Sequence, residues 1–86
     1  MQSYVVTFHT HFGATLFRKR ALPRFPGLAL APVPRCLSAS CGICAQFDAA
    51  DVTGVDACFD EFASETEADS LYRHESGNYE RLQCRE

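Results

Sequence analysis

The strongest strand signal in this chain is YVVTF, residues 4–8. Val, Thr, Tyr and Phe favour extended backbone because branched and aromatic side chains pack well on a pleated surface. The run is apolar at almost every position, so we expect a central strand that is covered on both faces. A helix is predicted directly after it, over about residues 11–22, because Thr10 can cap its first turn and Ala14, Phe17 and Ala21 recur at helical spacing.

The elements further along the chain are shorter and are separated by turn residues. Strands are predicted over residues 28–31, 43–47 and 70–73, and a second helix over residues 53–66. Pro23 and Pro26 end the first helix, and the pattern from Thr53 to Asp56 has the form of a capping box for the second. From Glu75 onward the chain is polar, and we expect it to be loosely ordered.

The order strand, helix, strand, strand, helix, strand is that of the split βαβ unit. It predicts an α+β fold, a ferredoxin-like βαββαβ sandwich with a small four-stranded sheet and two helices on one face. Residues 1–74 would form a single domain and residues 75–86 a polar C-terminal tail. The expected core consists of Phe8, Phe17, Leu30, Phe47, Val55, Phe59 and Phe62.

Composition argues against two classes of function, nucleic-acid binding and membrane association. No acidic residue precedes Asp48, whereas five basic residues do, and 11 acidic residues follow, for a net charge of −3. Five basic residues without an aromatic stacking motif do not favour nucleic-acid binding. No apolar run approaches the ~20 residues that span a bilayer, so no membrane association is expected. The first residues lack the pattern of a secretory signal, and we expect a cytoplasmic protein.

Three of the five cysteines lie in one short segment, PVPRCLSASCGIC, residues 32–44. In a reducing compartment, clustered cysteines are typically catalytic, redox-active or metal-binding. Cys41 is the candidate nucleophile, because Arg35 supplies a positive charge and Gly42 permits backbone N–H groups to converge on its sulfur. Ser38 and Ser40 can donate hydrogen bonds to a thiolate or to a persulfide.

The same cysteines permit other interpretations. Cys41 and Cys44 form a C-x-x-C pair, which can close a reversible disulfide. Cys36, Cys41 and Cys44, together with the distant Cys84, match the C-x4-C-x2-C…C spacing of plant-type [2Fe–2S] proteins, and a zinc site would use the same ligands. If Cys41 is instead a small buried thiol beside a turn, the chain is a non-catalytic interaction module.

Residues elsewhere in the chain have simpler interpretations. His9 and His11 are predicted to be exposed or capping residues at the end of the first strand. Cys58, on the apolar face of the second helix, is predicted to be a packed thiol.

The loop also carries a wider pattern, P-x-P-R-x-x-S-x-S-C-G, which runs from Pro32 to Gly42 and follows a strand. It resembles the signature of the Putative Se/S carrier protein-like family, and the resemblance covers roughly residues 4–73. The resemblance implies a carrier rather than an enzyme, with sulfur or selenium held on Cys41 as a persulfide or perselenide. The implied partners are a cysteine desulfurase-like donor and an acceptor enzyme, and the implied carrier needs no cofactor. Cys36 and Cys44 are additions to the signature; either could release the cargo by forming a disulfide. No oligomeric state is indicated.

Overall fold

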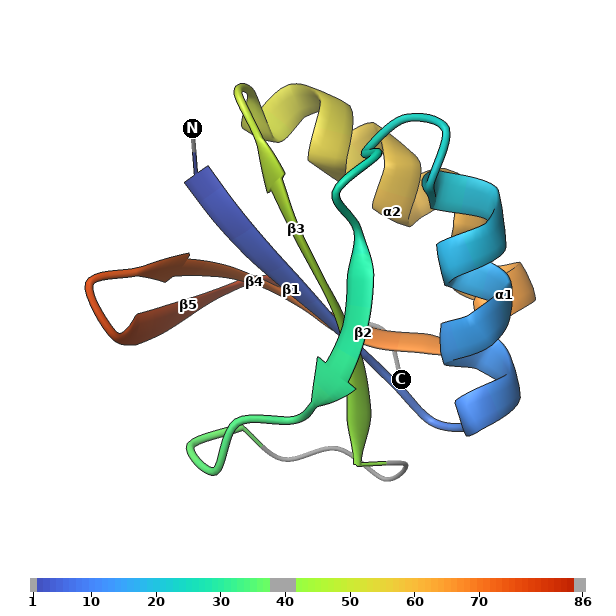
Figure 1. Cartoon of the computed structure of the whole chain (residues 1–86), viewed down its shortest axis with the longest axis horizontal. Helices are drawn as coiled ribbons and strands as arrows, with labels where there is room; N and C mark the ends of the chain where they lie inside the picture. The colour runs from blue at the N-terminus through green and yellow to red at the C-terminus, as the bar shows by residue number, and fades with distance from the viewer. Residues whose placement is uncertain (1, 38–41, 85–86) are drawn as a thin grey trace.

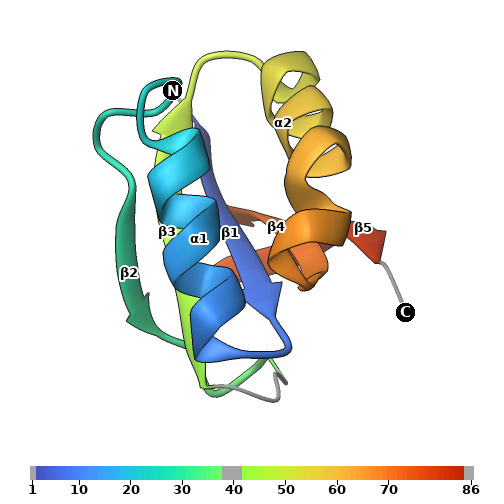
Figure 2. The same ribbon diagram turned by 90° about the vertical axis from the view of Figure 1, so that its right-hand side faces the viewer.

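Two helices cover one face of a five-stranded antiparallel sheet (Figures 1 and 2). The computed structural model describes residues 2–37 and 42–84. Its elements in chain order are β1 (Gln2–Phe8), α1 (His11–Ala21), β2 (Ala29–Pro32), β3 (Ile43–Ala49), α2 (Val52–Thr66), β4 (Ala68–Glu75) and β5 (Asn78–Cys84). Among these residues, no helix combines the length and apolar character that crossing a membrane requires.

The strand predicted to be central is central. The sheet has the order β2-β3-β1-β4-β5, so β1 pairs with β3 on one side and with β4 on the other. The α+β class and the placement of both helices on one face are confirmed. The predicted four-stranded ferredoxin-like sandwich is not matched exactly, because β5 adds a fifth strand beside β4.

The prediction of a loosely ordered chain after Glu75 is wrong. Residues Asn78–Cys84 form β5, which pairs antiparallel with β4. The connecting turn has positive φ at both Ser76 (51°) and Gly77 (82°). Two successive residues of positive φ are characteristic of the tight hairpin turns that match the natural twist of a strand pair.

The predicted cap of α1 is confirmed, whereas the predicted cap of α2 is wrong. The Thr10 hydroxyl accepts a 3.0 Å hydrogen bond from the Gly13 N–H and caps α1, as predicted. The predicted capping box that begins at Thr53 is wrong, because Asp51 is the cap and its carboxylate accepts from the Thr53 N–H at 2.9 Å. Asp serves this position as well as Ser or Thr, and α2 therefore begins at Val52.

The core lies between the helices and the sheet. Five of the seven predicted core residues are buried there, namely Phe8, Phe17, Phe47, Val55 and Phe59. Leu30 and Phe62 are only partly buried at its border. In β1, Val6 and Phe8 point into this core, so Val5 and Thr7 point to the opposite face by the alternation of a strand. Val5 and Thr7 are buried as well, as expected for a central strand.

Candidate functional site

The cysteine-rich segment forms the connection between β2 and β3, which we call the motif loop (residues 33–42). The two strands stay paired as far as Pro32 and Ile43. Beyond this pair, the Val33 N–H donates a 3.0 Å hydrogen bond to the Gly42 carbonyl. Gly42 has a φ of 73°, in the left-handed region that glycine adopts readily. These contacts hold both ends of the motif loop together at one end of the sheet (Figure 1).

Arg35 and Cys36 lie in a turn at the start of the motif loop. A 3.0 Å hydrogen bond from the Leu37 N–H to the Pro34 carbonyl closes this turn. Both Arg35 and Cys36 are exposed. Within the part of the chain that the structure describes, Arg35 forms no ion pair. Its guanidinium is therefore available to an anionic group at this end of the sheet.

Three residues predicted for the site, Ser38, Ser40 and Cys41, lie outside the described residues. Whether Arg35 approaches the Cys41 sulfur, and whether Cys41 pairs with Cys44, stay predictions. The structure does establish the positions of β2 and β3, the two paired strands that flank the motif loop.

Cys44, the second residue of β3, is fully buried. Its thiol lies 3.7 Å from the Pro32 carbonyl, to which it donates, and 4.0 Å from the Gln46 side-chain nitrogen, from which it accepts. In the sheet it stands directly opposite Ala31 of β2 and Thr7 of β1. Since Ala45 and Phe47 face the helices, Cys44 belongs to the helix-free face.

The alternative metal site uses the sulfur atoms of Cys36, Cys41, Cys44 and Cys84. Within residues 2–37 and 42–84, no three His, Cys, Asp or Glu side chains gather as ligands of a metal ion. The register separates Cys44 from Cys84, since Cys44 pairs with Thr7, Thr7 with Ser70, and Ser70 with Cys84. Three strand spacings amount to about 14 Å. An iron–sulfur or zinc site stays a prediction, and this register does not favour it.

Tyr79 belongs to the surroundings of the cysteines and is not among the residues that the sequence singles out. It lies on β5 and stacks face to face on His74 of β4, with ring centroids 4.3 Å apart. Burial raises the pKa of Tyr79, and the negative charge that Cys36 and Cys44 carry when ionised raises it further. The turn signal Ser76-Gly77 is the feature of the sequence that indicates this hairpin.

Cys58 is a packed core thiol, as predicted. It lies on the buried face of α2, and its side chain is almost fully covered. Burial raises the pKa of Cys58, and the neighbouring Arg24 guanidinium partly offsets this effect. Arg24 itself forms a 2.6 Å ion pair with Glu61 and lies over the Phe62 ring. Cys58 thus packs in the core beside Arg24, away from the motif loop.

The end of the sheet that carries the motif loop also presents an exposed aromatic side chain. Phe12, in the first turn of α1, is 72% exposed, and no other large apolar side chain among the described residues is exposed. β1 ends and β3 begins at this end, because Thr7 is paired with Cys44. α1 starts there and packs over β3 and β2. Phe12 and the motif loop therefore belong to the same end of the molecule.

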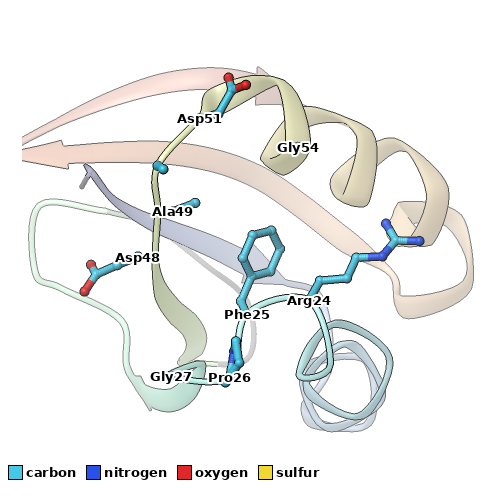
Figure 3. Close-up of a pocket in the computed structure, with 9 residues that line it drawn as sticks. Arg24, Phe25, Pro26, Gly27, Asp48, Ala49, Asp51 and Gly54 are labelled. Atoms are coloured by element: carbon cyan, nitrogen blue, oxygen red, sulfur yellow. The ribbon is translucent and has the colours of Figure 1, made fainter.

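A hollow lies at the opposite end of β3 (Figure 3). It has a volume of about 500 Å³ and lies between the turn after α1 and the start of α2. Arg24 and Phe25 line one side, and Asp51 and Gly54 the other. It contains none of the residues predicted for the site. The Asp51 carboxylate already accepts a hydrogen bond as the cap of α2.

Comparison with known proteins adds one finding. A family model described as Putative Se/S carrier protein-like matches residues 3–73. No curated protein and no solved structure matches the chain. The matched region runs from β1 into β4, includes the whole motif loop, and ends before the β4–β5 turn.

Proposed function

Because the chain belongs to the Putative Se/S carrier protein-like family, we propose that it carries sulfur or selenium on Cys41 and hands this cargo to an acceptor enzyme. The family match over residues 3–73 is the observation that carries the proposal. Two further observations support it. The motif loop is closed at its base by the bond between Val33 and Gly42, and Arg35 is exposed at its start.

Loading of Cys41 is a transfer between persulfides. The Cys41 thiolate attacks the outer sulfur of a persulfide on a cysteine desulfurase-like donor. The S–S bond of the donor breaks, a new S–S bond forms at Cys41, and the donor cysteine leaves as a thiolate. In this proposal Arg35, Ser38, Ser40 and the backbone N–H groups near Gly42 favour the anionic sulfur, because cations and hydrogen-bond donors favour the ionised form of a thiol.

Cys36 is the better of the two predicted release residues. A thiolate that attacks the inner sulfur of the Cys41 persulfide forms a disulfide and expels the cargo as hydrosulfide. Cys36 is exposed and lies in the same loop as Cys41, whereas Cys44 lies in β3 and its thiol donates to the Pro32 carbonyl. A dithiol reductant then restores the two thiols. The reducing cytoplasm, which we propose as the site of action, supplies such reductants.

The acceptor and the donor would meet the chain at the end of the sheet that carries the motif loop. Phe12 is exposed there, and exposed aromatic side chains are over-represented at protein interfaces. Arg35 adds a positive charge to the same end. We therefore propose Phe12 as part of the contact with the desulfurase-like donor.

The experiment is incubation with a purified cysteine desulfurase and cysteine, followed by mass spectrometry of the alkylated protein. We expect an additional sulfur on Cys41 of the wild-type chain and its loss in Cys41→Ser. The matched control is Cys84→Ser, which removes an exposed cysteine of β5 and should load normally. Equal alkylation rates at all accessible cysteines, with no additional sulfur on Cys41, would favour an interaction module instead.

A further inference from the structure

The helix-free face of the sheet carries a row of polar side chains. Cys44 of β3, Thr7 of β1 and Ser70 of β4 stand side by side in consecutive pairs of the register. All three are buried, with exposed fractions of 0%, 0% and 3%. Directly opposed residues in an antiparallel pair have their Cβ atoms about 4.5–5.5 Å apart. The Thr7 hydroxyl and the Cys44 thiol are therefore close neighbours.

The Thr7 hydroxyl has an unmet hydrogen-bonding capacity. Its oxygen is buried and has no hydrogen-bond partner among the described residues. A buried hydroxyl without a partner is destabilising by about 1–3 kcal/mol. Such a group beside a cysteine indicates that something else supplies the acceptor. The Cys44 sulfur accepts a hydrogen bond from the Gln46 amide at 4.0 Å, so one donor already faces this thiol.

A hollow lies beside the Cys44–Thr7 pair on the helix-free face of the sheet. The next opposed pair along the strands is Val5 and Gln46. Both residues line a hollow of about 240 Å³ on the helix-free face. Gln46 is exposed, and its side chain stands between this hollow and the Cys44 sulfur. A small solute that enters the hollow is thus one side chain away from Cys44.

We propose that Cys44 is a second site for the sulfur or selenium cargo, and that the Thr7 hydroxyl holds the terminal atom of this cargo by donating a hydrogen bond to it. The identity of the cargo rests on the proposed function, but the site does not require Cys41. A persulfide lengthens the side chain by one S–S bond of about 2.05 Å. In this proposal the terminal atom of the cargo is the anionic acceptor that the buried Thr7 hydroxyl lacks.

The transfer needs no oxidant. The Cys44 thiolate attacks the outer sulfur of a persulfide or polysulfide donor, whose S–S bond breaks as a new one forms at Cys44. The donor leaves as a thiolate or a shorter polysulfide and takes the proton that Cys44 gave up. Attack on the inner sulfur of the donor would instead give a disulfide between Cys44 and the donor. Attack on the outer sulfur transfers that sulfur to Cys44, where it remains a persulfide.

The test uses inorganic polysulfide as the donor and the full chain with Cys36→Ser and Cys41→Ser, so that the motif loop cannot carry the cargo. Mass spectrometry with fragmentation should locate one extra sulfur on Cys44. After removal of the donor, Thr7→Val should shorten the lifetime of this adduct about tenfold, the loss expected for one hydrogen bond to a charged acceptor. Thr7→Ser keeps the hydroxyl and should retain the lifetime.

Two controls make the outcome decisive. Ser70→Ala removes the hydroxyl on the far side of Thr7 and should leave the lifetime unchanged. Thr7→Val without cargo should melt no lower than the parent, since it removes a hydroxyl that has no partner. Loading of Cys84 without Cys44, or equal lifetimes with Val and Thr at residue 7, overturns the proposal. Because Cys41 is absent, either result is independent of the desulfurase experiment.

Discussion

The backbone carbonyl of Thr66 lies directly against Gly13: a Cβ built on residue 13 would stand 2.0 Å from the Thr66 oxygen. Gly13 is in the first turn of α1 and Thr66 is the last residue of α2. The end of one helix therefore touches the start of the other through backbone alone. This contact sets the position of α1 at the end of the sheet that carries the motif loop.

Gly13→Ala is expected to destabilise the protein by more than the ~1–3 kcal/mol of ordinary overpacking, because the obstacle is a backbone oxygen and not a flexible side chain. The matched control is Gly54→Ala in α2, where a Cβ meets nothing within 4 Å. That change should raise stability by about 0.5–1 kcal/mol. Urea melts of both variants check the contrast; equal effects would mean that the helices do not approach as described.

Phe59→Ala should lower the free energy of unfolding by about 3–5 kcal/mol, as loss of a fully buried aromatic side chain does. Phe12→Ala removes the same side chain from a site that is 72% exposed and should change stability by less than about 0.5 kcal/mol. In the desulfurase assay, however, Phe12→Ala should slow loading while leaving the reaction of polysulfide with the chain unchanged. Loading of Phe12→Ala by the desulfurase at the wild-type rate would exclude Phe12 from the contact with the donor.

Arg35→Ala should slow the alkylation of Cys41 near neutral pH by about tenfold, because a guanidinium within ~4–6 Å of a thiol favours its ionised form by an order of one pKa unit. Arg35→Lys should restore part of the rate, since it keeps the charge but not the planar fork of donors. The pH profile of alkylation for the three proteins checks this. Cys84 serves as the internal reference, and identical Cys41 profiles would remove Arg35 from the activation mechanism.

Stability should decline in mildly alkaline solution because of Cys58. Burial raises the pKa of Cys58 above its ordinary value of 9.0. The folded state thus keeps this proton where the unfolded chain releases it, and the contribution is fully present below pH 9 and lost as pH rises further. Denaturant melts from pH 7 to pH 10 should show the decline. Cys58→Ala should flatten it, whereas Cys84→Ala, at an exposed position, should not.

Much of the fold follows from the spacing of large apolar residues. The run from Tyr4 to Phe8 indicates a central strand, and the helical spacing of Phe17, Val55 and Phe59 indicates two helices that share one core. The strand that the sequence pattern did not predict is β5, at the edge of the sheet. Its side chains are exposed or only partly buried, so it lacks the alternation of apolar and polar residues by which strands are predicted.

The candidate site was less accessible to prediction, because it depends on the register of strands that are distant in the chain. The motif loop could be placed between two strands from its prolines and Gly42. That Thr7 stands opposite Cys44 could not be predicted, since a slip of one residue would turn either side chain to the other face. The same holds for Tyr79, whose place beside His74 depends on the β4–β5 hairpin.

The two edge strands, β2 and β5, are poorly suited to pair with a strand of another chain. β2 has only four residues and ends at Pro32, which has no N–H to offer to another chain. β5, at the other edge, exposes the charged side chains of Glu80 and Arg81. Short strands, prolines and charges are the devices by which natural sheets resist pairing with foreign strands. Recognition of a partner by strand addition is thereby disfavoured, in keeping with the side-chain contact proposed for Phe12.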